Sequence, residues 1–355
     1  MPASGAAGLW QLAPYLPAMP LSTHPPTARF ALALLLACAR PAGPALAQAA
    51  PRDTSFTVHS ALRSARKQRP DLQLARPPVP ASIRCRYNVA YCQASGRALH
   101  LDVFAPRARA PRGGYPAVLV VHGGGWRSGS PSQHWPLAQQ LAARGFVVAT
   151  AEYRLSAEAP YPAALLDLQA ALRYLRAHAR RLHLDTARVA AWGFSAGGQL
   201  AALLATTGPE VPPPGAARPC WPGPGHAVQA LVDVDGILAF THPESGEGDD
   251  SRGTSAATAW LGAPRAAQPE RWLQAGALSH VSARTPPTLF LNSSVARMHA
   301  GRDDFARQLD GFGIYHEAHT FADAPHPFPL FEPWFQPVLD YTVAFLQRVL
   351  PPAGR

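Results

Sequence analysis

A serine flanked by glycines provides the clearest sign of chemistry in this sequence. The residues Gly193-Phe194-Ser195-Ala196-Gly197 fit the pattern Gly-X-Ser-X-Gly, with a mostly apolar run over 186–192 before them and an alanine- and leucine-rich run over 198–205 after them. This setting is typical of a sharp turn between a strand and a helix, where small flanking residues let the two elements approach closely. The pattern predicts that Ser195 is a nucleophile at a helix N-terminus, where negative charge is stabilised. The alternative is that Ser195 only caps the helix.

A triple-glycine segment lies about seventy residues upstream of the serine. His122-Gly123-Gly124-Gly125-Trp126 directly follows an apolar run over 117–121. Glycines leave backbone N–H groups unshielded, so such a loop can converge on a developing oxyanion. The expected oxyanion donors are the amides of Gly124, Gly125 and Ala196. A merely flexible loop is the alternative, and the pairing with Gly-X-Ser-X-Gly argues against it.

Over about 115–350 the chain resembles α/β-hydrolase esterases of the hormone-sensitive-lipase-like kind. Within these it is most similar to bacterial feruloyl and acetyl esterases that deacylate plant polysaccharides. The resemblance is carried by Glu152-Tyr153-Arg154-Leu155, by 192–200 and by 286–291. It implies a serine hydrolase that needs no cofactor and no metal ion.

A serine hydroxyl needs a general base to become a nucleophile near neutral pH. In the fold that the chain resembles, the histidine follows the acid and lies on the loop after the last strand. His326 occupies that place, after a predicted strand over 315–321 and before a closing helix over 337–350. It is the expected base, and His299 is the nearby alternative. His316 and His319 are assigned to packing or to the surface, and His122 to ordering the oxyanion loop.

The carboxylate that would orient His326 is where the sequence departs from the family pattern. Relatives usually carry an aspartate just after the strand that corresponds to 288–291, but here Asn292-Ser293-Ser294 follows it. We therefore expect Asp303 to be the acid, with Asp304 and Asp235 as alternatives. Asp303 and Asp304 also suit the start of a helix, where acids are favoured whether or not they are catalytic.

Strand-like and helix-like segments alternate through the catalytic region, which predicts an α/β fold: a mostly parallel central sheet with helices on both faces. Ligands bind at the carboxyl ends of the strands in such sheets, where both motifs lie. The expected strands are 117–121, 146–151, 189–192, 228–234, 288–291 and 315–321, and the expected helices are 135–144, 161–181 and 337–350.

The remaining segments divide the chain. Residues 1–47 are predicted to be a signal peptide, with Met19 a possible true start, and 48–80 an extended arm or linker. The catalytic domain is expected over 81–350, opened by antiparallel strands and carrying lid segments at about 206–226 and 237–285. Cys38 could instead be the lipidated N-terminus of a lipoprotein, and either reading exports the protein to the periplasm or medium.

Composition limits the other classes of function. The 355 residues carry a formal net charge of +10 with only one lysine, Lys67, and have 47% hydrophobic residues. No basic run with interleaved aromatic residues occurs, so nucleic-acid binding is not expected. The apolar run near the N-terminus is too short to span a membrane. Of the cysteines after the signal, Cys85 and Cys92 are the favoured disulfide pair, and their spacing suits no metal site.

We therefore expect an exported serine esterase that cleaves short acyl esters (acetyl, methyl or feruloyl) on a carbohydrate, such as an esterified polysaccharide. Four tryptophans were considered as faces for sugar stacking: Trp126, Trp221, Trp260 and Trp334. A general lipase or an oligopeptidase of the same fold is the alternative enzyme. A non-catalytic hydrolase fold used for binding is the alternative from another class.

Overall fold

An eight-stranded sheet runs through the part of the chain that the computed structural model describes, which is residues 53–207, 220, 221 and 225–351. The strand order is β2-β3-β5-β4-β6-β7-β8-β9. The six strands from β5 to β9 in this order pair in parallel, while β2 and β3 are antiparallel to their neighbours, as expected for the opening strands. Their bounds are β2 Ile83–Ala94, β3 Arg97–Pro106, β4 Tyr115–Val121, β5 Val147–Ala151, β6 Leu184–Phe194, β7 Ala230–Val234, β8 Thr288–Asn292 and β9 His316–Thr320.

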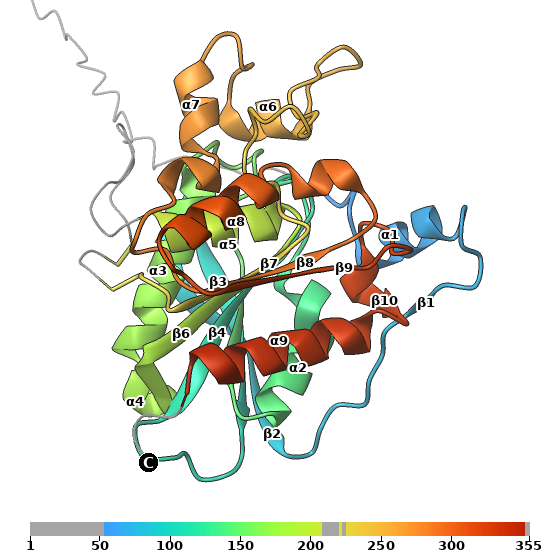
Figure 1. Ribbon diagram of the computed structural model, residues 1–355. Helices are drawn as coiled ribbons and strands as arrows, with labels where there is room; N and C mark the ends of the chain where they lie inside the picture. Colours follow the sequence, from blue (N-terminus) through green and yellow to red (C-terminus); the bar gives the residue numbers. More distant parts are fainter. Residues whose placement is uncertain (1–52, 208–219, 222–224, 352–355) are drawn as a thin grey trace, which may run out of the picture. The chain divides into compact units, whose positions relative to one another are not determined.

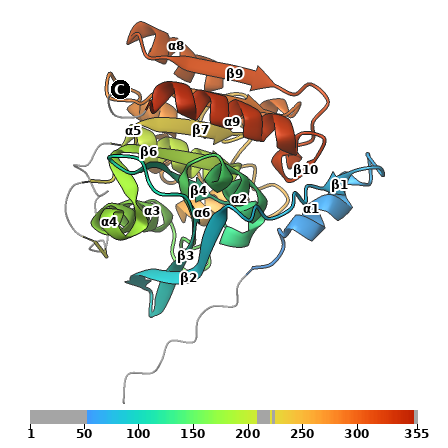
Figure 2. The same ribbon diagram turned by 90° about the horizontal axis from the view of Figure 1, so that it is seen from below.

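Helices cover both faces of the sheet because its central strands are apolar on both sides. Along β4, Ala117, Leu119 and Val121 pack into one buried cluster, and Val118 and Val120 pack into another. The first cluster contains residues of α3 (Ala163–Ala177), α5 (Ala196–Thr206) and α8 (Arg302–Gly311). The second contains residues of α2 (Trp135–Ala143) and α9 (Phe335–Val349). In Figure 1, α2 and α9 lie below the sheet and α5 and α8 above it, and Figure 2 shows α2 and α9 on the near face. The predicted α/β architecture is therefore present.

The segment predicted as an extended arm folds onto the domain where it is described. Thr57 caps α1 (Val58–Ala65) in a capping box with Ser60. The short strand β1 (Gln73–Leu74) pairs with β10 (Phe331–Glu332), and Leu72 is buried in the second cluster. The prediction of a linker over 48–80 is therefore wrong for residues 53–80. In α1, Val58, Ala61, Leu62 and Ala65 recur at helical spacing and lie in or against the second cluster, but the helix has only eight residues, so this apolar period is short.

The expected lid segments differ in how far they can be described. Most of 206–226, like the predicted signal peptide, Met19 and Cys38, lies outside the described residues. Residues 237–285 form α6 (Ala256–Leu261), α7 (Pro269–Gln274) and a 3₁₀ turn at Ala277–His280. Trp260 and Trp272 are completely buried in the first cluster, so α6 and α7 are anchored to the domain.

The disulfide joins Cys92 to Cys220, not to Cys85, which is free. The predicted Cys85–Cys92 pair is wrong because both residues lie in the same extended strand, β2. Seven residues of strand span about 23 Å, whereas disulfide-bonded Cα atoms lie within about 7 Å of each other. The actual bridge ties the segment at Cys220 to β2 across a sequence separation of 128 residues.

None of the helices within the described ranges has both the length and the apolar character that crossing a bilayer requires.

The buried His134 predicts that the protein is destabilised by mild acid. The side chain packs edge-on against the rings of Trp192 and Phe194 and is 2% exposed. Burial, followed by the nearby His122, lowers the pKa of His134 to about 3 from its ordinary 6.5. Between pH 6.5 and about pH 3, the unfolded chain therefore binds a proton at His134 that the folded chain does not bind. This contribution to stability is present above pH 6.5 and is lost as the pH falls toward 3, by up to about 1.4 kcal/mol per pH unit.

We expect His134→Gln to reduce the slope of the free energy of unfolding against pH between pH 6.5 and 4, as measured by urea denaturation. The exposed His59 provides the matched control, since His59→Gln should leave the slope unchanged. Equal slopes in the wild type and His134→Gln would contradict the assignment of a neutral buried imidazole.

Candidate active site

Ser195 lies at a strained turn between β6 and α5. Its backbone has φ 56° and ψ −124°, a conformation that L-residues rarely adopt. Strand and helix approach so closely that a Cβ atom on Gly193 would lie 2.0 Å from the carbonyl oxygen of Gly197. Only glycine fits there, which explains the flanking glycines of the motif. The strain is maintained by the buried strand and helix on either side, and it presents the Ser195 side chain to the pocket described below.

His326 lies on the loop after β9, at the position expected for the base. Its Nε2 is 2.8 Å from Ser195 Oγ. The loop is held by Ser294, whose backbone N–H and hydroxyl both donate to the carbonyl oxygen of Ala324. The ring of Phe194 packs against the imidazole with 5.0 Å between the ring centroids. These contacts fix the imidazole within hydrogen-bonding distance of the serine.

The carboxylate that contacts His326 belongs to Asp235, at the end of β7. Its Oδ2 accepts a hydrogen bond from His326 Nδ1 at 2.9 Å, and its Oδ1 accepts one from the Ser293 N–H at 2.7 Å. The Asp235 side chain is completely buried. With Nδ1 donating to Asp235, the neutral imidazole has a lone pair on Nε2 that can accept the serine proton.

Asp303, the first choice from the sequence, is therefore a wrong assignment, and so is Asp304. Asp303 is 74% exposed and forms an ion pair with Arg302. Asp304 pairs with Arg307 and His242. Both lie in the first turn of α8, the structural alternative considered from the sequence. The least favoured candidate, Asp235, is the one that the structure places beside His326.

The parallel pairing of β7 and β8 explains why the acid can follow β7 and not β8. Strands β7 and β8 pair in parallel, so residues at their carboxyl ends lie side by side. Asp235 follows β7, and Ser293 follows β8, where relatives usually carry the acid. The hydrogen bond between Ser293 N–H and Asp235 joins these two strand ends. Asn292, the last residue of β8, instead accepts a hydrogen bond from Arg302.

A second buried carboxyl lies two residues before the acid. Burial, and then the charge of Asp235, raise the pKa of Asp233 well above its ordinary value. Both effects favour the protonated, neutral form of Asp233 over its charged form. The backbone N–H of Gly236 hydrogen-bonds to Asp233 and partly opposes the shift.

The glycine loop packs directly against the serine turn. A Cβ atom on Gly123 would lie 2.8 Å from the Phe194 carbonyl oxygen and 3.0 Å from Ser195 Cβ. Gly124 and Gly125 have φ of 125° and 59°, and both line the same pocket as Ser195 and Ala196. The expected oxyanion donors are thus together beside the serine.

Tyr153 holds the beginning of this loop. Its hydroxyl donates to the His122 carbonyl oxygen at 2.9 Å, and its ring stacks on the His122 imidazole. Ser156 Oγ and N–H both donate to the carbonyl oxygen of Trp126 at the other end of the loop. The segment after β5 therefore holds both ends of the glycine loop.

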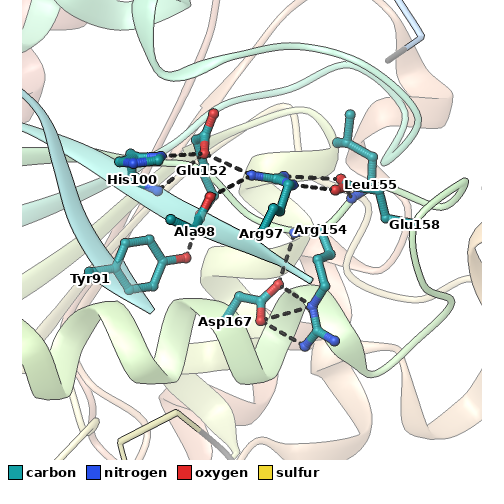
Figure 3. A network of polar contacts seen from close by, with 9 residues as sticks. All are labelled: Tyr91, Arg97, Ala98, His100, Glu152, Arg154, Leu155, Glu158 and Asp167. Atoms are coloured by element: carbon teal, nitrogen blue, oxygen red, sulfur yellow. Dashed lines mark hydrogen bonds and ion pairs between the residues drawn. The ribbon is translucent and has the colours of Figure 1, made fainter. Parts of the chain in front are cut away.

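Figure 3 shows the polar network that fixes this segment. Arg97 binds the carboxylates of Glu152 and Glu158, and Arg154 binds both oxygens of Asp167 on α3. Because Asp167 is 2% exposed and Arg154 13%, this ion pair is screened little by solvent. The Glu-Tyr-Arg-Leu motif noted in the sequence thus serves to position the glycine loop.

The triad side chains open into a small pocket of about 220 Å³. Its wall is mainly apolar and includes Phe56 from the N-terminal segment and Ile237, Ala256 and Met298. The lid stretch 237–285 contributes Ile237, Glu247 and Ala256 to it. Sequence reasoning missed Phe56, Arg297 and Met298, because no motif marks them and only folding brings them to Ser195. Ile237, Glu247 and Ala256 were placed only generally, within the predicted lid 237–285.

The tryptophans considered for sugar stacking do not offer open faces. Trp126, Trp260 and Trp334 are 3% exposed or less. The rings of Trp126 and Trp260 stack on each other at 5.0 Å, and Trp126 Nε1 donates to Gln199. Trp221 is half-buried and donates to the Tyr91 carbonyl oxygen. Among the described residues there is also no group of three or more His, Cys, Asp and Glu side chains able to hold a metal ion.

Residues 101–297, more than half of the chain, match the BD-FAE family. The chain belongs to the BD-FAE family. The matched residues of this BD-FAE protein include the glycine loop, Ser195 and Asp235, and end before His326.

The chain is also similar to curated carboxylesterases. Carboxylesterase NlhH of Mycobacterium tuberculosis is 40% identical over 101 residues, which are 28% of this chain and 32% of NlhH. LipM of the same organism, described as a probable carboxylic ester hydrolase, is 30% identical over 198 residues, 56% of this chain and 45% of LipM. The chain spans less than half the length of these two relatives.

Among solved structures, the esterase Est2 of Thermogutta terrifontis aligns with a TM-score of 0.60 and 24% identity, over 80% of this chain and 99% of Est2. The α/β-hydrolase fold expected from the sequence is confirmed, as is the resemblance to hormone-sensitive-lipase-like and other esterases.

The geometry predicts that Asp235, not Asp303, sets the reactivity of Ser195. Asp235→Asn should slow the reaction of Ser195 with a fluorophosphonate probe by roughly 10²- to 10⁴-fold, because an asparagine no longer stabilises the imidazolium and can favour the wrong imidazole tautomer. Asp303→Asn, on the exposed turn of α8, should react at the wild-type rate. Labelling followed by mass spectrometry would measure both rates, and equal slowing of the two variants would contradict the assignment.

Proposed function

We propose that this protein is an exported serine esterase that removes short acyl groups from a carbohydrate. The observation that carries the hydrolase part is the hydrogen-bonded series Asp235–His326–Ser195 beside the glycine loop. A polarised serine facing preorganised amides matches what acyl transfer requires, namely a nucleophile, a base and oxyanion donors. The similarity to carboxylesterases supports the same chemistry.

The reaction proceeds in two halves. Ser195 Oγ attacks the ester carbonyl carbon while His326 Nε2 accepts its proton, and the amides of Gly124, Gly125 and Ala196 hold the oxyanion. Collapse of the tetrahedral intermediate breaks the ester C–O bond, and His326 gives its proton to the departing alcohol. Water then attacks the acyl-Ser195 by the same route and releases the carboxylic acid. Asp235 stays ionised and stabilises the imidazolium in both halves. The residues supply all the groups this chemistry needs, so the proposal includes no cofactor.

Pocket size favours a short acyl group. A pocket of about 220 Å³ suits an acetyl or similarly small group better than a long chain. This weighs against the general lipase. An oligopeptidase would cleave peptides. A non-catalytic binding protein would turn over no ester.

We expect kcat/KM for p-nitrophenyl acetate to exceed that for the octanoate by at least roughly tenfold, since poorly fitting methylenes lose binding in the transition state. Ser195→Ala should abolish both activities. A preference for octanoyl or longer esters would overturn the short-acyl proposal and leave a lipase. Turnover by Ser195→Ala at the wild-type rate would overturn the mechanism itself.

Release of acetate from acetylated xylan or pectin tests the carbohydrate part of the proposal. It rests on the resemblance to polysaccharide esterases and on the expected export, and no nucleic acid is a proposed partner. Hydrolysis of simple esters with no acid released from either polymer would contradict it.

Export is proposed from the apolar run and small residues before Gln48. Protein purified from its native host should begin at Gln48, or at a lipidated Cys38, by intact-mass measurement. A chain that still begins at Met1 or Met19 would contradict both forms of export.

A further inference from the structure

One acidic side chain lines the catalytic pocket without belonging to the triad. Glu247 lies in the loop between β7 and α6, and its side chain is only 13% exposed. Burying a carboxylate in a mainly apolar wall is costly unless it is paired or binds a ligand. The Glu247 carboxylate therefore needs a charged or hydrogen-bonding partner in this pocket.

The other acids of the same loop are directed elsewhere. Asp250 accepts hydrogen bonds from Ser255 N–H and Thr258 Oγ1 and so supports the start of α6. Asp249 accepts from the Ser251 N–H, and Glu244 is 55% exposed beside His242. Of these four acids, only Glu247 lines the pocket.

Glu247 forms an ion pair with Arg297, which lies in the 3₁₀ turn Ala296–His299 after β8. The Oε1 atom of Glu247 accepts from Arg297 Nη1 at 3.1 Å. No described residue hydrogen-bonds to the second carboxylate oxygen. Arg297 also lines the pocket, is 52% exposed, and uses only Nη1 in hydrogen bonds to described residues. Among the described residues, the second carboxylate oxygen of Glu247 is left to accept a hydrogen bond from a ligand, and the remaining N–H groups of Arg297 are left to donate one.

This combination matches the chemistry of a sugar hydroxyl. Each hydroxyl is both a donor and an acceptor, so it can donate to a carboxylate and accept from a guanidinium at the same time. Such charge-assisted hydrogen bonds are stronger than neutral ones. A simple alkyl alcohol could not satisfy these groups and would leave a charged pair desolvated without compensation.

The alcohol part of the ester has to lie on the His326 side of the pocket, since His326 protonates it as it leaves. Glu247, Arg297 and His326 line the same pocket. Burial raises the pKa of the Glu247 carboxyl, and the charge and hydrogen bond of Arg297 oppose this shift. Among the described residues, Glu247 and His326 do not hydrogen-bond to each other.

We propose that Glu247 and Arg297 form the subsite for the alcohol part of the substrate and select a hydroxyl-bearing ring, as in a sugar ester, over an apolar alcohol. This rests on the proposed ester hydrolysis and deepens it. The two residues determine specificity and take no part in the proton transfers.

A matched pair of substrates tests the subsite. Monoacetylated methyl xyloside and cyclohexyl acetate both release a six-membered-ring alcohol, but only the first has further hydroxyls. We expect the wild type to prefer the xyloside. Glu247→Gln and Arg297→Gln should each lower the ratio of kcat/KM values, xyloside over cyclohexyl acetate, by roughly tenfold, mainly through KM for the xyloside. Glu244→Gln, an exposed acid of the same loop, should leave the ratio and both rates unchanged.

The outcomes separate this inference from the proposed function. Equal losses on both substrates in both variants, or no change in the ratio, would overturn the subsite while ester hydrolysis stands. A wild type that hydrolyses both acetates equally well would overturn it too. A wild type that hydrolyses neither would overturn the proposed function itself.

Discussion

The buried carboxylate of Asp235 is the constraint on which the rest of the site depends. A fully desolvated charge needs hydrogen bonds to both of its oxygens, and it obtains them from His326 Nδ1 and the Ser293 N–H. These two bonds set the imidazole orientation and join the ends of β7 and β8. Burial and the charge of Asp235 favour the neutral form of the neighbouring Asp233, which limits the negative charge beside Asp235. The serine then meets an imidazole whose acceptor nitrogen faces it.

Polar networks away from the triad maintain the second half of the site. The three glycines of the loop have no side chains, so contacts of the neighbouring residues fix the loop geometry. Tyr153 and Ser156 donate to carbonyl oxygens at its two ends. Their segment is in turn held by Arg97 and by the Arg154–Asp167 pair (Figure 3). Preorganised donors of this kind stabilise charge without reorganising during the reaction.

Part of the pocket wall comes from segments outside the serine turn and the glycine loop. Phe56 precedes α1, Glu247 lies in the loop before α6, and Arg297 follows β8. Such loop positions can change without disturbing the sheet, because few core contacts depend on them. The α/β sheet therefore positions the triad and the glycine loop, while these added segments form part of the pocket wall beside them.

The sequence by itself determined the local features. Ser195 with its glycines, the loop at Gly124 and Gly125, His326 after the last strand and the alternation of strands and helices are all encoded over short stretches, so periodicity and spacing reveal them. Only the tertiary structure decided between Asp303 and Asp235. Asp303 lies 23 residues before His326 and Asp235 lies 91 residues before it, and these separations do not show which strand ends are neighbours. The tertiary structure also decided that Cys92 pairs with Cys220 and that Glu247 lines the catalytic pocket. Pairings between distant segments depend on packing of the whole sheet, which no local pattern records.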